Sequence, residues 1–341
     1  MLSVLLVSVL LNANLFTVRA NEQQKDPYMT RTFPASSIRA VEASASGGSI
    51  TINGDAGSQA TVEVFVSGNK LSDERIKELL EENYSIDIKV EGGKLYAVAK
   101  SINRITNWNQ QGLSISFKIS VPKQVNSNLH TSGGSIHIAN LSGAQDIKTS
   151  GGSLTVENVS GNIAGTTSGG SINVTNSSDN INLKTSGGSI TARDCSGKIN
   201  LKTSGGSVKM SQLDGTIDAS TSGGSITADN VRGTLKTGTS GGSVKLSGIS
   251  GNVDAKTSGG SMNVEMESVS DYVKLSNSGN TNLSLPAGRG YNLKIRANKI
   301  ETSGLKDYRG NVESRSMDGT VGNGGPEIDV RTSQRVNLTF K

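Results

Sequence analysis

Apolar side chains in the middle of the chain alternate with polar ones in short pairs that recur at a fixed interval. Positions are counted here from the threonine of a repeated Thr-Ser-Gly-Gly tetrapeptide. Apolar residues then fall at positions 6 and 8, as in Ile136 and Ile138, and again at positions 15 and 17, as in Ile181 and Leu183. A spacing of two is the period of a β-strand with one buried face. Each repeat therefore predicts two short strands.

The tetrapeptide recurs every 18 residues, at Thr131, Thr149, Thr167, Thr185, Thr203, Thr221, Thr239 and Thr257. A constant period of this size is typical of a solenoid, in which each unit stacks on its neighbours. The Ser-Gly-Gly segment predicts one turn, and Asn or Asp at position 10 with Gly at position 13 predicts a second. The sequence thus predicts an all-β fold, a parallel β-solenoid (β-helix) with 18-residue coils. At about 4.8 Å per coil, eight coils span roughly 40 Å.

A three-sided β-helix built from hexapeptides is the alternative for an 18-residue coil. It needs apolar residues at positions 6, 12 and 18. Position 12 is mostly Ser, and position 18 holds Lys148, Lys184, Lys202 and Lys256. The pattern excludes the hexapeptide architecture.

Strand parity predicts which side chains face the core. The position 1 threonines are expected to point inward, and positions 7, 9, 16 and 18 to face solvent. Cys195 shares position 11 with apolar residues of other coils, so we expect it to fill the core rather than to react. At position 10 we expect a ladder of side chains at the second turn, made by Asn140, Asn158, Asn176, Asp194, Gln212 and Asn230.

The regular repeats are flanked by irregular segments. The solenoid is expected to begin near Val41 and to be interrupted by an amphipathic helix at 72–82, capped by Ser72, and by strands at 86–90, 94–99 and 113–121. This insert is expected to cover the amino end of the stack. The period breaks after Val269, and the tail predicts irregular strands that form the other cap.

These boundaries divide the chain into five parts. They are a signal peptide (1–20), an extended leader (21–39), a solenoid start with an α/β capping insert (40–126), the regular solenoid (127–276), and degenerate coils with a C-terminal cap (277–341). The signal rests on the apolar run from Met1 to Leu11 and on Val18 and Ala20 before the expected cleavage site, although no Lys or Arg precedes the run. It predicts export to the periplasm, the cell surface or the extracellular space.

Composition narrows the function classes. The chain has 42 Gly and few aromatic residues (5 Phe, 6 Tyr and 1 Trp), which predicts a thin core. Its net charge of +5 is dispersed, so nucleic acid is not an expected partner, and no segment predicts membrane insertion. The single cysteine excludes an intramolecular disulfide.

The repeats at 131–264, the preceding segment 115–122, the helix-bearing insert and the Gly-rich tail together resemble the putative adhesin family of bacterial envelope proteins, a domain family of unknown function. The resemblance covers roughly residues 40–341. It implies an exported β-solenoid of the cell envelope, and it supplies no catalytic residues.

No catalytic, cofactor or metal site is predicted. His130 and His137 lack a third ligand nearby, and the Gly pairs lack the pattern of a phosphate-binding loop. Asp218 and Asp254 are expected two coils apart, roughly 9.5 Å, which is near the separation used by inverting glycosidases. Lys236 between them is expected to keep both carboxylates ionised, so a surface charge ladder is favoured.

The leading hypothesis is a non-enzymatic adhesin-like or scaffolding protein whose repetitive polar face binds a glycan or a protein by many weak contacts. The expected ligand-facing ladder is Lys148, Lys184, Lys202 and Lys256, suited to an acidic polymer. The alternative is a carbohydrate-active enzyme of the β-helix type. An ice-binding solenoid ranks last, because it needs outward rows of threonine.

Overall fold

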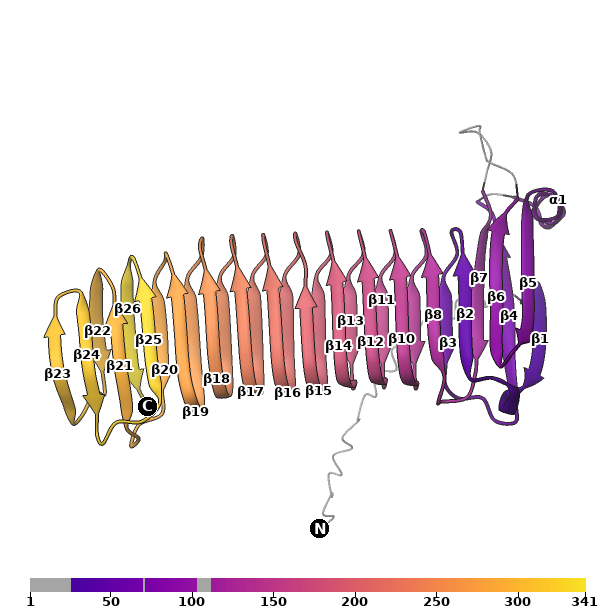
Figure 1. Ribbon diagram of the computed structural model, residues 1–341. Coiled ribbons are helices and arrows are strands. Elements are labelled where there is room, and N and C mark those ends of the chain that lie inside the picture. Colours follow the sequence, from indigo (N-terminus) through magenta and orange to yellow (C-terminus); the bar gives the residue numbers. More distant parts are fainter. Residues whose placement is uncertain (1–25, 70, 103–111) are drawn as a thin grey trace, which may run out of the picture.

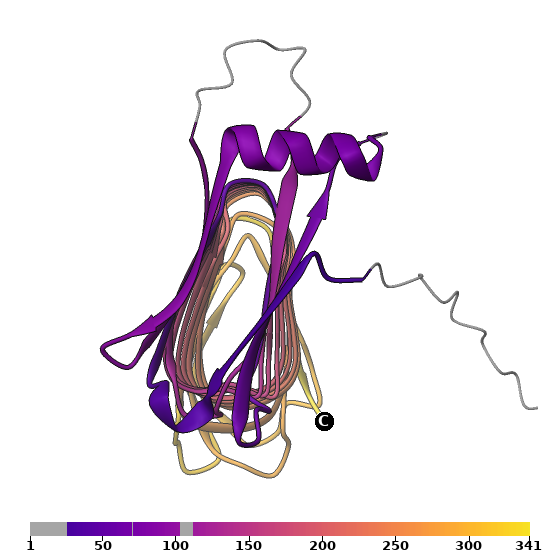
Figure 2. The same ribbon diagram turned by 90° about the vertical axis from the view of Figure 1, so that its right-hand side faces the viewer.

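The computed structural model describes residues 26–69, 71–102 and 112–341. The repeats wind into a long flattened rod (Figure 1), and successive turns of the chain superpose in the view along it (Figure 2). All described strands belong to one large, mostly parallel sheet. The fold is therefore all-β and solenoid-like.

The repeat region contains twelve strands, and from β15 onward each strand continues through the second turn from one wall to the other. They are β8 (Asn126–Thr131), β9 (Ile136–Ala139), β10 (Ser142–Thr149), β11 (Leu154–Glu157), β12 (Ser160–Thr167), β13 (Ile172–Thr175), β14 (Ser178–Thr185), β15 (Ile190–Lys202), β16 (Val208–Thr221), β17 (Ile226–Thr239), β18 (Val244–Thr257) and β19 (Met262–Asn277). Cα partners in neighbouring parallel strands lie 18 residues apart, as in Ile136↔Leu154 and Ile172↔Ile190.

Two long walls face each other across a thin core. The β9 wall holds β9, β11, β13 and the first parts of β15 to β19, whereas the β8 wall holds β8, β10, β12, β14 and the last parts of β15 to β19. Inward residues at positions 6, 8, 11, 15 and 17 are buried and mostly aliphatic. Cys195 lies among them with 2% exposure, as its position predicts, and its Sγ donates to the carbonyl oxygen of Arg193 at 3.1 Å.

The position 1 threonines point inward, which confirms the prediction from strand parity. Thr185 is 6% exposed; its Oγ1 donates to the carbonyl oxygen of Gly170 in the preceding coil (2.8 Å) and accepts from the N–H of Gly188 in its own coil (3.3 Å). The same two bonds recur in the other regular coils from Thr149 to Thr257. Because each buried hydroxyl both donates and accepts a hydrogen bond, it holds the turn in place without the desolvation penalty of an unpaired polar group.

At the second turn, the residues at position 10 adopt the left-handed conformation, with φ between 49° and 57° from Asn140 to Asn230. The expected amide ladder forms at its start, where Asn158 Nδ2 donates to Asn140 Oδ1 (3.1 Å) and Asn140 Nδ2 donates to Asn53 Oδ1 (2.8 Å). Asn tolerates this conformation better than most residues.

Residues 29–120 form the amino end of the rod, where an insert follows the first pair of wall strands. The elements are β1 (Met29–Pro34), η1 (Ala35–Ser37), β2 (Ala40–Ala45), β3 (Ile50–Asn53), β4 (Gln59–Ser67), α1 (Asp73–Asn83), β5 (Tyr84–Glu91), β6 (Lys94–Ser101) and β7 (Ser114–Ser120). Strands β2 and β3 pair in parallel with β8 and β9, and α1 crosses the end of the rod (Figure 2). Ser72 Oγ accepts from the N–H of Arg75, as the expected cap.

The chain before β2 is described only from residue 26 onward. The predicted signal peptide (1–20) and the start of the predicted leader lie outside the described residues. The described part of the leader includes β1, which pairs antiparallel with β4, because Met29 and Phe33 pack against the core. No helix among the described residues has the length and apolar character that crossing a membrane requires.

The carboxyl end extends both walls with strands that are out of chain order. They are β20 (Thr281–Leu285), β21 (Tyr291–Arg296), β22 (Lys299–Ser303), β23 (Tyr308–Glu313), β24 (Ser316–Val321), β25 (Glu327–Thr332) and β26 (Arg335–Phe340). On the β8 wall the order is β19, β25, β21, β24, β23, and on the β9 wall it is β19, β20, β26, β22. The last pairings on the β8 wall, β21 with β24 and β24 with β23, are antiparallel.

Candidate ligand-binding face

The outer surface of the β8 wall displays the side chains at positions 14, 16 and 18 of each coil; we call it the cationic face. The predicted ladder residues Lys148, Lys184, Lys202 and Lys256 all lie on it and are exposed. They share one column but do not form an unbroken row, because Thr166, Ser220 and Gly238 occupy the rungs between them.

The four ladder lysines differ in their surroundings. Lys148 Nζ lies 2.9 Å from Asp146 Oδ2, and Lys256 Nζ lies 3.6 Å from Asp254 Oδ1. Lys184 and Lys202 are direct partners on adjacent strands, and neither forms an ion pair with another described residue. Like charges directly opposite each other in a sheet are destabilising, so this pair attracts an anion.

A third lysine adds to this central charge. Lys198 lies on the same strand as Lys202, at position 14, and it also forms no ion pair within the described part of the chain. Asparagine side chains lie beside the three lysines. In the column of Lys198, Asn180 Nδ2 donates to Asn162 Oδ1 (2.7 Å), and in the column between Lys198 and Lys202, Asn200 Nδ2 donates to Asn182 Oδ1 (3.3 Å). Amide groups beside unneutralised ammonium groups can bind carboxylates, sulfates and hydroxyls.

The column at position 16 is a ladder of alternating charge. The predicted stack of Asp218, Lys236 and Asp254 is present, and the register continues it through Lys274, Asp329 and Lys294. Asp254 and Asp329 therefore each lie between two lysines of neighbouring strands, as in the surface charge ladder that the sequence favours.

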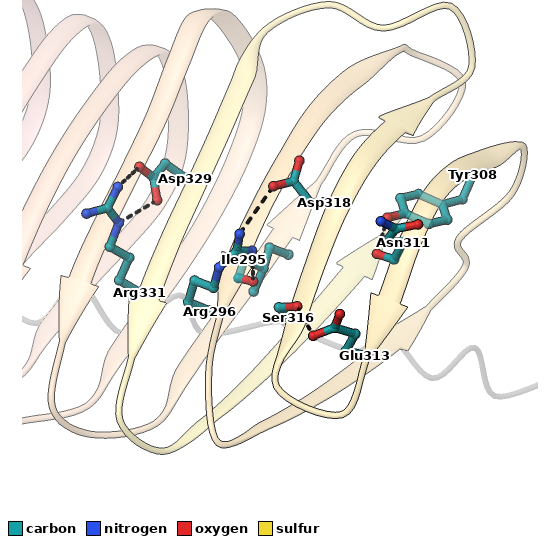
Figure 3. Close-up of polar contacts among 9 residues, drawn as sticks. All are labelled: Ile295, Arg296, Tyr308, Asn311, Glu313, Ser316, Asp318, Asp329 and Arg331. Atoms are coloured by element: carbon teal, nitrogen blue, oxygen red, sulfur yellow. Dashed lines mark hydrogen bonds and ion pairs between the residues drawn. The ribbon is translucent and has the colours of Figure 1, made fainter.

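The 18-residue repeat did not predict the carboxyl-terminal part of the cationic face. Arg331 and Arg296 continue the column of the ladder lysines. Arg331 makes two hydrogen bonds with the carboxylate of Asp329 (2.8 and 3.0 Å), which raise the pKa of the guanidinium, and Arg296 reaches Asp318 at 3.2 Å (Figure 3). These residues lie beyond the break in the period, so only their strand pairing reveals them.

Surface relief is shallow on the cationic face. A depression of about 350 Å³ lies between Asp254, Lys256, Lys274, Asp329 and Arg331. A larger one of about 480 Å³ lies off the face, at the second turns around Asn230, and the largest of these, about 700 Å³, lies among the end loops near Arg289. A shallow charged surface is suited to an extended polymer rather than to an enclosed small molecule.

The outer surface of the β9 wall has a different charge balance. There Arg193, Lys209, Lys245, Lys299 and Arg335 are nearly matched by Glu157, Asp229, Glu265 and Glu301. On the cationic face, lysines and arginines outnumber the acidic residues, which are Asp146, Asp218, Asp254, Asp318, Glu327 and Asp329. The positive charge of the rod is therefore concentrated on one side.

The two histidines lie on different walls. His130 lies on β8, whereas His137 lies on β9 with its Nε2 3.7 Å from Glu157 Oε2. Among the described residues, no group of three or more His, Cys, Asp or Glu side chains is placed to hold a metal ion. The thiol of Cys195 is buried, and this burial raises its pKa.

Comparison with known proteins agrees with the repeat pattern. Residues 166–334 match the model of the family described as Toastrack DUF4097. The match spans just under half of the chain and includes the later TSGG repeats. The family resemblance predicted from the TSGG repeats is thereby confirmed. No curated protein matches the chain.

Three solved structures are similar to this chain, all with TM-scores below 0.5. A putative adhesin from Bacteroides fragilis NCTC 9343 is 16% identical over 75% of this chain and 95% of that chain, with a TM-score of 0.33. A putative cell adhesion protein from Clostridium sporogenes ATCC 15579 is 11% identical (92% and 98% covered; 0.19). A putative lipid binding protein from Parabacteroides distasonis ATCC 8503 is 16% identical (92% and 97% covered; 0.31).

Proposed function

We propose that this protein is an exported, non-enzymatic, adhesin-like rod of 18-residue coils whose cationic face binds an acidic polymer, with Lys148, Lys184, Lys202 and Lys256 as the ligand-facing ladder. The observation that carries the proposal is the direct pairing of Lys184 with Lys202, without a neutralising acid among the described residues. A fold that keeps two like charges side by side loses some stability, and an anionic ligand recovers it.

The repeat spacing explains how a shallow surface binds usefully. Each coil contributes one or two weak contacts, and the rigid sheet holds them in line, so a polymer that engages one coil meets the next at high effective concentration. Because the contacts are exposed and ionic, salt screens them, and binding weakens as ionic strength rises.

The proposal is tested by retention on immobilised polygalacturonate compared with neutral dextran. The variant Lys184→Gln/Lys202→Gln is expected to lose roughly tenfold in affinity, since each surface ion contact contributes up to about 1 kcal/mol. The matched control is Lys209→Gln/Lys245→Gln, which removes the same charge from exposed positions on the β9 wall and is expected to bind as the wild type does.

Equal losses of affinity in both variants would show that binding depends on net charge alone, and this would refute a specific role for the cationic face. Equal retention of the wild type on dextran and on polygalacturonate would refute the preference for an acidic ligand. The bound polymer is also assayed for new reducing ends: release of product that disappears in Asp254→Asn would show that the protein is an enzyme.

A further inference from the structure

The last strand of the β8 wall, β23, has one unpaired edge. It pairs antiparallel with β24 along its whole length, and no other described strand lies against it. Figure 1 shows it at the extreme end of the rod, and five of its six residues are exposed. An open strand edge carries free N–H and C=O groups that can accept another strand.

The hairpin geometry identifies which groups are free. Only two residues connect Glu313 to its partner Ser316, so these two form a hydrogen-bonded pair, and every second residue does the same. Arg309, Asn311 and Glu313 then bond to β24, which leaves the N–H and C=O groups of Tyr308, Gly310 and Val312 directed at the open edge.

The core side of this strand is incompletely covered. Val312 lies opposite Met317, which is 1% exposed, yet Val312 itself is 65% exposed. The β9 wall ends with β22, one strand position earlier, so nothing described covers Val312 from that side. An apolar side chain on the inner face of a terminal strand is buried only if the sheet continues.

The outer side of β23 carries opposite charges placed symmetrically about Asn311. Arg309 lies two residues before it and Glu313 two residues after it (Figure 3 shows Asn311 and Glu313). Arg309 forms no ion pair with a described residue, and Glu313 accepts only a hydrogen bond from Ser316 Oγ (3.0 Å). By contrast, the end of the β9 wall is already neutralised, because Glu301 pairs with both Lys299 and Arg335.

We propose that two copies of this chain join end to end through antiparallel pairing of their β23 strands, centred on Asn311. Arg309 then lies opposite Glu313 of the partner subunit, twice in each interface. The free backbone groups of Gly310 meet those of Val312 of the partner subunit, as an antiparallel register requires. The strand is complementary to itself under a two-fold axis, which favours a second copy over an unrelated strand.

The same axis keeps the inner faces of both sheets on one side. Val312 is then flanked by the neighbouring strand, with Val312 of the partner subunit in the diagonal position on the same inner face. The two rods form one rod of double length with the cationic faces continuous. The contact is a single six-residue strand from each chain and buries less than the roughly 1,200 Å² of a stable complex. The dimer therefore forms and dissociates with concentration.

Sedimentation velocity of the full chain over a wide concentration range tests this. Arg309→Glu and Glu313→Arg each replace two attractions by two repulsions and are expected to weaken dimerisation at least roughly tenfold. The double variant Arg309→Glu/Glu313→Arg restores it, and so does mixing the two single variants, because each then meets the opposite charge. Arg289→Glu makes the same charge change on an exposed end loop and leaves the dimer intact.

Unchanged melting curves establish that the variants fold. A wild type that sediments as a monomer at every concentration overturns the proposal. The proposal is also overturned if both single variants dimerise as the wild type does, or if the two single variants fail to associate when mixed. Either result would mean that the register about Asn311 is wrong.

Discussion

Adding one methyl group at the fourth residue of a TSGG turn should damage the stack far more than adding it at the third. A Cβ on Gly188 would lie 2.1 Å from the carbonyl oxygen of Gly170 and 2.6 Å from the nitrogen of Ser171, both backbone atoms of the preceding coil. A Cβ on Gly187 would lie 3.5 Å from the nearest atoms, the carbonyl oxygens of Gly169 and Ser168, which is an ordinary contact.

The magnitude follows from the bonds that hold these two coils together. Restoring an ordinary contact at Gly188 requires the coils to separate locally by more than 1 Å, about the difference between 2.1 and 3.4 Å. That separation disrupts the Thr185 hydroxyl bond to Gly170 (2.8 Å) and the bond from Ile172 N–H to the carbonyl oxygen of Ser189 (2.9 Å). At about 1 kcal/mol for each bond, together with about 1–3 kcal/mol of strain, Gly188→Ala should cost roughly 3–5 kcal/mol.

Urea denaturation followed by circular dichroism measures the difference between the variants. Gly187→Ala should lie within about 1 kcal/mol of the wild type, since alanine also reduces the entropy of the unfolded chain. Hydrogen exchange should show the loss in Gly188→Ala confined to the coils on either side of the turn, because a stack transmits stability between neighbours. Equal effects of the two substitutions would refute the close backbone approach that the argument assumes.

Two further predictions concern buried side chains of the core. Thr185→Val should destabilise by about 1–3 kcal/mol, because it leaves the carbonyl oxygen of Gly170 and the N–H of Gly188 without the hydroxyl, whereas Thr185→Ser should retain most of the stability in the same denaturation assay. Because burial raises the pKa of Cys195, its thiol stays protonated at neutral pH, and iodoacetamide should label the native protein far more slowly than the urea-unfolded one; equal rates would contradict the burial.

The sequence by itself determined which side chains are inside along the regular coils. A strand has a period of two, so the spacing of Ile136 and Ile138 predicts that both side chains point into the core and that the polar residues beside them point outward. The outward position of Lys184 and Lys202 follows from the same alternation. The amphipathic stripe and the capping Ser72 located α1 within one or two residues, because helix ends are encoded locally.

The carboxyl end was decided only by the tertiary structure. Strand β19 contains irregular register shifts against β18, so the 18-residue count fails beyond it, and β25 lies between β19 and β21 although it follows both in the chain. Position in the sequence therefore gives no guide to which side chains share a column. The continuation of the cationic face through Arg331 and Arg296, and the open edge at β23, depend on pairings between distant segments, which local periodicity does not encode.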